Sequence, residues 1–106
     1  MKKALIMCAA GMSSSLMASK TTKYLNEKGY DIEVEATIAA TASNLIKEAK
    51  YDLYMISPQA KMYYDKLKVL ADGADRPLVM IPPQAYAPIP LGIGKLAKIV
   101  VDNIKQ

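Results

Sequence analysis

The residues best suited to chemistry lie near the N-terminus, where one cysteine precedes a run of small residues and serines. This segment reads Cys8-Ala9-Ala10-Gly11-Met12-Ser13-Ser14-Ser15. If Cys8 ends a strand and a helix begins at Ser13 or Ser14, the first backbone N–H groups of that helix point toward the sulfur. These amides carry partial positive charge, so they favour a thiolate and also bind phosphoryl groups. The segment predicts a nucleophilic thiolate in a phosphoryl-binding loop, with the hydroxyls of Ser13, Ser14 and Ser15 as further donors.

A second interpretation of Cys8 is structural, because most lone cysteines behave as small buried apolar residues. A cysteine in the interior of a strand fits that interpretation. A cysteine at the end of a strand, facing a small-residue loop and the start of a helix, fits the reactive one. The position of Cys8 relative to the end of its strand therefore decides between them.

The residue types that the sequence lacks exclude several kinds of reactive site. The 106 residues include one cysteine and no histidine. Intrachain disulfides, Cys-x-x-Cys redox motifs, thiolate or imidazole metal sites and Cys–His or Ser–His pairs are thereby excluded within the chain. The sequence implies no metal and no organic cofactor. Any acid–base partner of Cys8 must be a carboxylate, a lysine, a tyrosine, the backbone or another molecule.

Composition and charge indicate one globular domain over residues 1–106. Hydrophobic residues make up 52% and charged residues 23%, with a net charge of +4. The lysines are dispersed along the chain, and nothing resembles a basic nucleic-acid-binding stripe with interleaved aromatic residues, so we predict no nucleic-acid binding. The apolar run before Cys8, Ala4–Met7, is too short for a secretory signal, and four prolines interrupt the uncharged stretch Leu78–Gly94. We therefore expect a cytoplasmic protein.

Apolar runs alternate with helical patterns along the chain. They predict strands over Lys3–Met7, Ile32–Ala36, Leu53–Ile56 and Leu78–Ile81. The expected fold is a single α/β domain with a four-stranded parallel sheet of order 2-1-3-4 and helices on both faces. In such sheets ligands bind beyond the carboxyl ends of the strands, where the loop containing Cys8 is expected.

Four helices should pack against this sheet. The first ends at Lys28-Gly29, a cation followed by a C′ glycine. The second begins near Ser43 and directs Leu45, Ile46 and Ala49 inward. The third buries Tyr63, Leu67 and Leu70 opposite a charged face of Lys61, Asp65, Lys68 and Asp72. The last begins between Pro90 and Gly94 and buries Leu96, Ile99, Val100 and Ile104, with Lys95, Lys98, Asp102 and Lys105 exposed.

The motif around Cys8 resembles a known family. The pattern Cys-x-Ala-Gly-Met-Ser-[Ser/Thr]-Ser after a short strand is similar to enzyme IIB of the bacterial phosphoenolpyruvate-dependent sugar phosphotransferase system, lactose/cellobiose (chitobiose) class. The resemblance covers essentially the whole chain and includes Ser57-Pro58-Gln59, where the family commonly has Gly-Pro-Gln. It implies a fold similar to that of low-molecular-weight tyrosine phosphatases.

The resemblance also implies a function. Cys8 would be the phosphocysteine of a phosphohistidine–sugar phosphotransferase component, taking the phosphoryl group from a IIA partner. The group would then pass to cellobiose, chitobiose or lactose bound by the membrane partner IIC, at the inner face of the membrane. Ala9, Ala10, Gly11, Met12, Ser13, Ser14 and Ser15 would form the phosphoryl-binding loop. We expect Met12, Pro58, Gln59, Pro83 and Tyr86 to form an apolar docking collar for IIA and IIC.

Two other functions share this loop. A low-molecular-weight tyrosine phosphatase has Cys-x5-Arg-[Ser/Thr], but here Ser14 stands where the arginine must bind the transferring oxygens. Leu78–Lys95 also lacks a carboxylate that could protonate the leaving group. A non-catalytic module binding a phosphorylated ligand is the third candidate. Gly92-x-Gly94 weakly resembles a phosphate loop, but we interpret it as a flexible start of the last helix.

Overall fold

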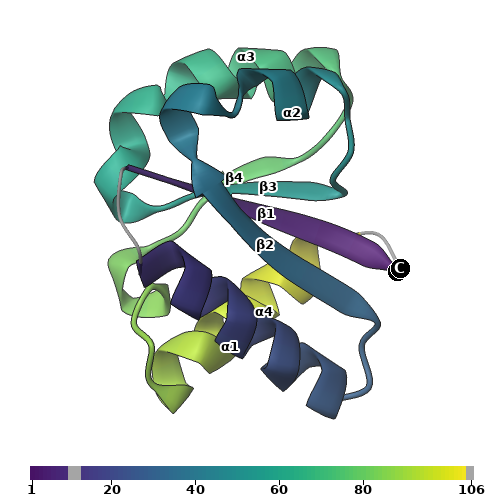
Figure 1. Cartoon of the computed structure of the whole chain (residues 1–106), viewed down its shortest axis with the longest axis vertical. Coiled ribbons are helices and arrows are strands. Elements are labelled where there is room, and N and C mark those ends of the chain that lie inside the picture. Colours follow the sequence, from purple (N-terminus) through teal and green to yellow (C-terminus); the bar gives the residue numbers. More distant parts are fainter. Residues whose placement is uncertain (10–12, 105–106) are drawn as a thin grey trace.

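Four parallel strands form one sheet in the order β2-β1-β3-β4 (Figure 1). They are β1 (Lys2–Cys8), β2 (Ile32–Ile38), β3 (Leu53–Ile56) and β4 (Leu78–Met80). The computed structural model describes residues 1–9 and 13–104, but not the side chain of Ser13. The predicted sheet order is confirmed, and β1 is a central strand hydrogen-bonded on both sides.

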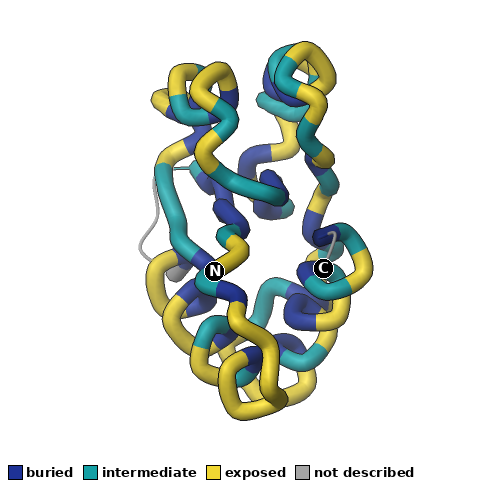
Figure 2. The backbone as a smooth tube through the Cα atoms, turned by 90° about the vertical axis from the view of Figure 1, so that its right-hand side faces the viewer, coloured by how far each residue is buried: buried dark blue, intermediate teal, exposed yellow. Residues whose placement is uncertain are grey.

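Helices cover both faces of the sheet, as predicted (Figure 1). On one face lie α1 (Ser13–Glu27) and α4 (Pro90–Asn103), and on the other lie α2 (Ser43–Lys47) and α3 (Tyr64–Gly73). Three short 3-10 helices follow β2, β3 and β4: η1 (Ala39–Thr41), η2 (Pro58–Tyr63) and η3 (Pro83–Ala85). Figure 2 shows buried backbone concentrated between the layers and exposed segments on the outside. None of the helices in the described part of the chain has the length and apolar composition to cross a membrane.

Strand β1 is apolar throughout its centre because it is buried on both faces. Ala4 and Ile6 pack into the core beneath α1 and α4, whereas Leu5 and Met7 pack into the core beneath α2 and α3. All four side chains are at most 1% exposed. Since successive side chains of a strand alternate between faces, Cys8 lies on the α1/α4 face of the sheet.

Some predicted boundaries differ from the structure. Strand β2 extends two residues past the predicted Ala36, because Thr37 and Ile38 continue the ladder with Met7 and Cys8. The prediction that Ala49 faces inward from the second helix was wrong. That helix ends at Lys47, and Ala49 is half-buried in the following turn with a φ of 52°. Gly29, with a φ of 92°, does follow the end of α1 as predicted.

The third helix also begins differently from the prediction. Pro58–Tyr63 forms a 3-10 segment, and the α-helix starts only at Tyr64. Its buried face includes Leu67, as predicted. The last helix begins at Pro90, within the predicted range, and buries Leu96 and Val100.

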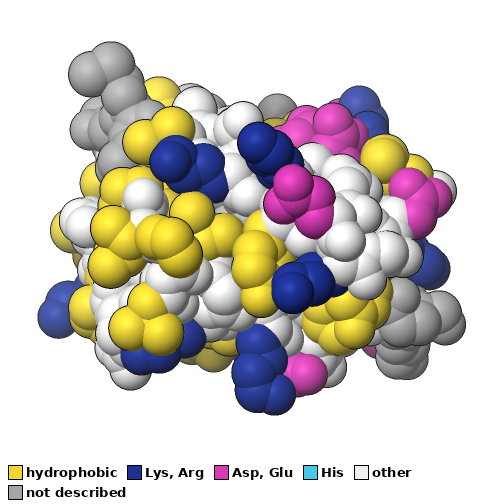
Figure 3. Space-filling view, turned by 90° about the horizontal axis from the view of Figure 1, so that it is seen from below, with side chains coloured by type: hydrophobic (Ala, Val, Ile, Leu, Met, Phe, Trp, Pro, Cys, Tyr) yellow, Lys and Arg dark blue, Asp and Glu magenta, His cyan; other side chains and the backbone are white. Residues whose placement is uncertain are grey.

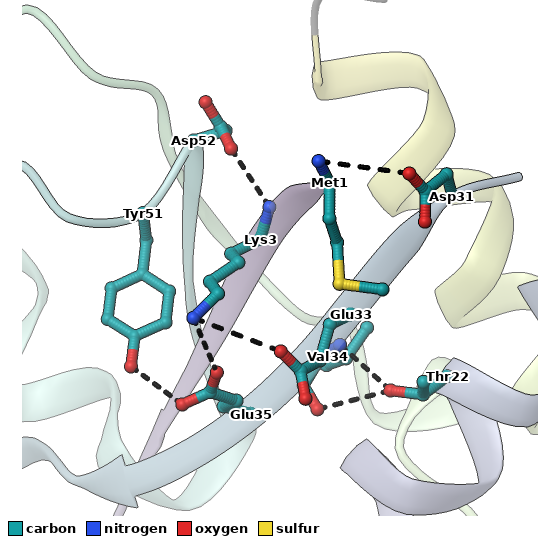
Figure 4. Close-up of polar contacts among 9 residues, drawn as sticks. All are labelled: Met1, Lys3, Thr22, Asp31, Glu33, Val34, Glu35, Tyr51 and Asp52. Carbon is teal, nitrogen blue, oxygen red and sulfur yellow. Dashed lines mark hydrogen bonds and ion pairs between the residues drawn. The ribbon is translucent and has the colours of Figure 1, made fainter.

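Polar contacts tie the amino-terminal half of β1 to its neighbours (Figure 4). Lys3 Nζ lies 3.9 Å from a carboxylate oxygen of Glu33 and 3.5 Å from one of Glu35. The Tyr51 hydroxyl donates a hydrogen bond of 2.8 Å to Glu35. On the edge strand β2, the backbone N–H of Val34 donates to the Thr22 hydroxyl at 2.8 Å. Helix α1 thus supplies a hydrogen-bond partner to the edge strand β2, whose backbone would otherwise be open to pairing with another strand.

Tyr51 should give the stability of the protein an alkaline pH dependence. Burial, followed by the hydrogen bond to Glu35, raises the pKa of Tyr51 from 10.0 to about 12. The folded state therefore holds the phenol proton more tightly, and this contribution is complete below the unfolded pKa and lost as the pH rises through the folded pKa. We expect the urea midpoint of wild type to fall between about pH 10 and 12, and this fall to be smaller in Tyr51→Phe.

The control for this titration is Tyr63→Phe, which removes a tyrosine hydroxyl from a different site. Its urea midpoint should follow the wild-type pH profile. An alkaline fall of wild-type size in Tyr51→Phe would contradict the assignment.

Candidate active site

Cys8 is the last residue of β1, at the carboxyl edge of the sheet. Its register partner on β2 is Ile38. The residue is 4% exposed, so its sulfur lies beneath the surface of this edge. Cys8 thus stands at the strand's end, the position that favours the reactive interpretation over the structural one.

The sulfur of Cys8 lies against two oxygen atoms. Its Sγ is 2.9 Å from Ser14 Oγ and 3.4 Å from the carbonyl oxygen of Thr37. A thiol has one proton, so it donates to only one of these oxygens at a time. If the sulfur is ionised, the Ser14 hydroxyl can turn and donate to it, whereas the Thr37 carbonyl can only accept. Ser14 therefore supports both protonation states of Cys8.

The first turn of helix α1 also contacts this sulfur. Ser14 lies in the first turn of α1, is 3% exposed, and contacts Cys8 through its side chain. The first N–H groups of a helix lack partners within the helix and carry partial positive charge. The sequence of the first turn, Ser13-Ser14-Ser15-Leu16, contains no carboxylate that would compete with an incoming anion. The arrangement suits an anion attached to, or placed beside, Cys8.

The structure places the predicted loop residues as follows. Ala9 directly follows β1 and packs partly against the core beneath α2 and α3. Ser13 begins α1, Ser14 contacts the sulfur, and Ser15 is exposed. Ala10, Gly11 and Met12 lie outside the described residues, as does the side chain of Ser13.

Four of the five predicted docking residues lie on segments that follow β3 and β4, at the same edge of the sheet as Cys8. Pro58 and Gln59 begin η2, and Pro83 begins η3. Tyr86 follows η3, is half-buried and packs against the core beneath α1 and α4. Met12 lies outside the described residues. Gln59 and Pro83 are exposed and Pro58 is half-buried, whereas Tyr86 also contributes to the core.

Exposed apolar side chains that the sequence did not single out gather on the elements at this edge. They are Leu16, Ile38, Met62, Met80, Ile89 and Leu91, each at least 41% exposed. Figure 3, seen from below, shows hydrophobic side chains gathered toward the side where α1 and α4 begin, with some basic side chains among them and the acidic side chains farther along. We call these six residues the apolar rim.

The sequence pattern did not predict that two further residues, Thr37 and Ser57, lie near Cys8. Thr37 supplies a carbonyl to the sulfur because β2 extends beyond the predicted Ala36. The β-branched Thr37 and Ile38, which continue the alternating pattern, were the signal for that extension. Ser57, directly after β3, lies opposite Cys8, and its position follows only from the register of β1 and β3.

The described residues around Cys8 support neither a metal site nor an arginine-assisted reaction. Within residues 1–9 and 13–104, no three His, Cys, Asp or Glu side chains are grouped so that they could hold a metal ion. The only arginine in the sequence, Arg76, lines a recess with Lys2 and Asp52 at the amino ends of the strands, the edge opposite Cys8. It therefore cannot act on a group carried by Cys8.

Comparisons with known proteins agree with this geometry. Residues 3–90 match the family described as PTS system, Lactose/Cellobiose specific IIB subunit. The galactose-specific EIIB component of Lactococcus lactis subsp. cremoris is 34% identical over 82 residues, covering 74% of this chain and 76% of that protein. The oligo-beta-mannoside-specific EIIB component of Bacillus subtilis is 31% identical over 86 residues, covering 81% and 82%.

Solved structures share the fold. The lactose-specific IIB domain from Streptococcus pneumoniae superposes with a TM-score of 0.83 at 20% identity, covering 98% of each chain. The cellobiose-specific IIB component from Borrelia burgdorferi gives a TM-score of 0.73 at 20% identity, covering 97% of this chain and 91% of that one.

Proposed function

Because this chain belongs to the lactose/cellobiose-specific IIB subunit family of the sugar phosphotransferase system, we propose that Cys8 is its phosphoryl carrier. As a IIB component, the chain is part of a phosphotransferase system for sugar uptake. The observation that supports Cys8 as carrier is its sulfur at the end of β1, 2.9 Å from Ser14 Oγ in the first turn of α1.

The proposed reaction has two transfers. The Cys8 thiolate attacks the phosphorus of a phosphohistidine on IIA, so that the S–P bond forms, the N–P bond breaks and the imidazole nitrogen keeps the electron pair. A hydroxyl of a sugar held by IIC then attacks the same phosphorus, the S–P bond breaks and the thiolate is restored. The proton of the sugar hydroxyl goes to a base outside this chain. Such transfers need positioning and charge stabilisation more than acid–base groups.

The proposed phosphoryl-binding loop runs from Ala9 to Ser15. Its backbone amides would hold the phosphoryl oxygens, and the α1 amino end would stabilise their charge. The absence of an arginine near this loop also fits a carrier. Without bidentate contacts to the transferring oxygens, attack by water is not promoted, so the phosphocysteine persists until a sugar arrives.

We propose that IIA and IIC bind in turn at the carboxyl edge, in the cytoplasm and at the inner face of the membrane. The docking surface would combine Met12, Pro58, Gln59, Pro83 and Tyr86 with the apolar rim. Two partners that exchange quickly at one site need a modest interface with fast release. The relatives are named for galactose and oligo-beta-mannoside, and we propose a disaccharide (cellobiose, chitobiose or lactose) for this chain.

A charged substitution at Met62 should weaken docking of IIA. Met62 is 73% exposed on η2, directly after β3. We expect Met62→Asp to lower kcat/KM for transfer from phospho-IIA about tenfold, the effect of losing one apolar anchor, with an unchanged melting temperature. The matched control is Val69→Asp, because Val69 is 70% exposed but lies in the middle of α3. Equal losses in both variants would contradict docking at this edge.

Reconstitution tests the proposed function. The protein is incubated with phosphoenolpyruvate, the general phosphotransferase proteins and IIA, and intact mass is recorded before and after adding IIC vesicles with each candidate sugar. We expect one phosphoryl group per chain, discharged only when a sugar is present. Release of inorganic phosphate without sugar would indicate a hydrolase instead. Phosphate-ligand binding that survives alkylation of Cys8, without any transfer, would indicate a binding module.

A further inference from the structure

Ser57 carries a buried hydroxyl close to the end of β1. The residue follows β3 directly and is 0% exposed. Its backbone N–H donates to the carbonyl of Met7 at 2.9 Å. Its Oγ, in contrast, has no hydrogen-bond partner among the described residues. A buried hydroxyl without a partner is destabilising, so its presence points to an acceptor that arrives with a ligand.

The register of the sheet places Ser57 next to Cys8. Met7 pairs with Ile56 in the β1–β3 ladder, so the next residues along the two parallel strands, Cys8 and Ser57, lie opposite one another. Ser57 is still extended, with φ −68° and ψ 157°. Its side chain therefore points to the face opposite Ile56, which is the α1/α4 face that Cys8 also occupies. Neighbouring strands are about 4.8 Å apart, so the backbones of Cys8 and Ser57 are separated by about one strand spacing and their side chains lie on the same face.

Two contacts of the Cys8 sulfur come from the β2 side of the sheet and from α1. Thr37 approaches the sulfur from β2, and Ser14 approaches it from α1. Ser57 directly follows β3, which lies on the other side of β1 from β2 and Thr37. A group attached to the sulfur would thus lie between the Thr37 carbonyl on the β2 side and the Ser57 hydroxyl on the β3 side.

Building on the proposed function, we propose that Ser57 binds the phosphoryl group carried by Cys8, donating its Oγ–H to a phosphoryl oxygen. Phosphorylation places three acceptor oxygens and a charge near −2 beside this hydroxyl. Hydrogen bonds to ionised acceptors are roughly twice as strong as neutral ones. Ser57 therefore stabilises the phosphorylated state specifically, and shifts the transfer equilibrium with phospho-IIA toward this chain.

The effects of Ser57→Ala on the melting temperature and on the transfer equilibrium distinguish this role from a structural one. Ser57→Ala removes a hydroxyl that none of the described residues pairs with, so the melting temperature of the unphosphorylated protein should stay the same or rise. The same change removes a donor from the phosphorylated protein, so the equilibrium constant for transfer from phospho-IIA should fall about tenfold. A residue that only fills space would not produce this combination.

Thr21→Val is the matched control. Thr21 is also 0% exposed, and its Oγ1 has no hydrogen-bond partner within the part of the chain that the structure describes. It lies on α1 seven residues beyond Ser14, about 10 Å farther along the helix. The valine variant should keep the wild-type transfer equilibrium.

The experiment mixes phospho-IIA with wild type, Ser57→Ala or Thr21→Val and measures the phosphorylated fraction of each by intact mass at equilibrium. Melting curves of the unphosphorylated proteins accompany it. A wild type that gains no phosphoryl group on Cys8 overturns the proposed function itself. A wild type that gains it while Ser57→Ala behaves identically overturns the role of Ser57 alone. A lower melting temperature for Ser57→Ala, or an equal fall for Thr21→Val, would also contradict that role.

Discussion

The Cys8→Ser variant is expected to accept phosphoryl groups from phospho-IIA at least about a thousandfold more slowly than wild type, the scale of removing a nucleophile. A thiolate is a strong nucleophile at neutral pH, whereas a serine hydroxyl needs an adjacent base. The chain contains no histidine to act as one. A radiolabelled phosphoenolpyruvate assay over a time course measures both rates.

This variant should keep its fold, which makes the loss interpretable. Serine is close in size to cysteine, and its hydroxyl can donate to Ser14 Oγ or to the Thr37 carbonyl as the thiol does. We therefore expect a melting temperature within a few degrees of wild type. Phosphoryl uptake by Cys8→Ser at the wild-type rate would show that another residue carries the group.

The second large effect concerns the start of α4. Gly92→Ala should lower the melting temperature by about 10 °C, because a Cβ there would lie 2.4 Å from the carbonyl oxygen of Ala87. Relieving a clash with backbone costs about 3 kcal/mol, which exceeds the roughly 1 kcal/mol that alanine contributes through helix propensity. Gly92 is therefore required for the close approach of the preceding loop to α4.

Gly94→Ala is the matched comparison, two residues along the same helix. A Cβ at Gly94 would meet the Tyr24 hydroxyl oxygen at 3.6 Å, an ordinary contact. Helix propensity should then dominate, and the melting temperature should rise by about 4–8 °C. Thermal unfolding of the two variants followed by circular dichroism tests this contrast. Shifts of the same sign and size would mean that the glycine pair serves flexibility, as the sequence first suggested.

The sheet could be predicted from the sequence because its patterns are strong and local. Ala4–Met7 and Leu53–Ile56 are apolar without interruption, which is typical of strands buried on both faces. The alternation of such runs with helical patterns leaves few topologies, and order 2-1-3-4 is the observed one. Ala49 was misplaced because α2 already ends at Lys47 and Ala49 adopts a left-handed conformation in the following turn, which no periodic pattern reveals.

The surroundings of Cys8 could be predicted only in part. The small-residue motif after an apolar run was enough to identify Cys8 and Ser14 as neighbours of a helix start. Thr37, at the end of β2, contacts Cys8, and Ser57, directly after β3, lies opposite it. Both positions depend on strand register, which is set by packing across the whole sheet, so a single sequence does not reveal them.

The most direct test of Cys8 as carrier is to locate the phosphoryl group on the protein. The chain is phosphorylated through IIA, examined by phosphorus NMR, digested under mild conditions and sequenced by tandem mass spectrometry. The account predicts a single S–P resonance and one modified peptide, with the phosphoryl group on Cys8. A phosphoryl group found on a serine or tyrosine, or a chain that acquires none from IIA, would contradict it.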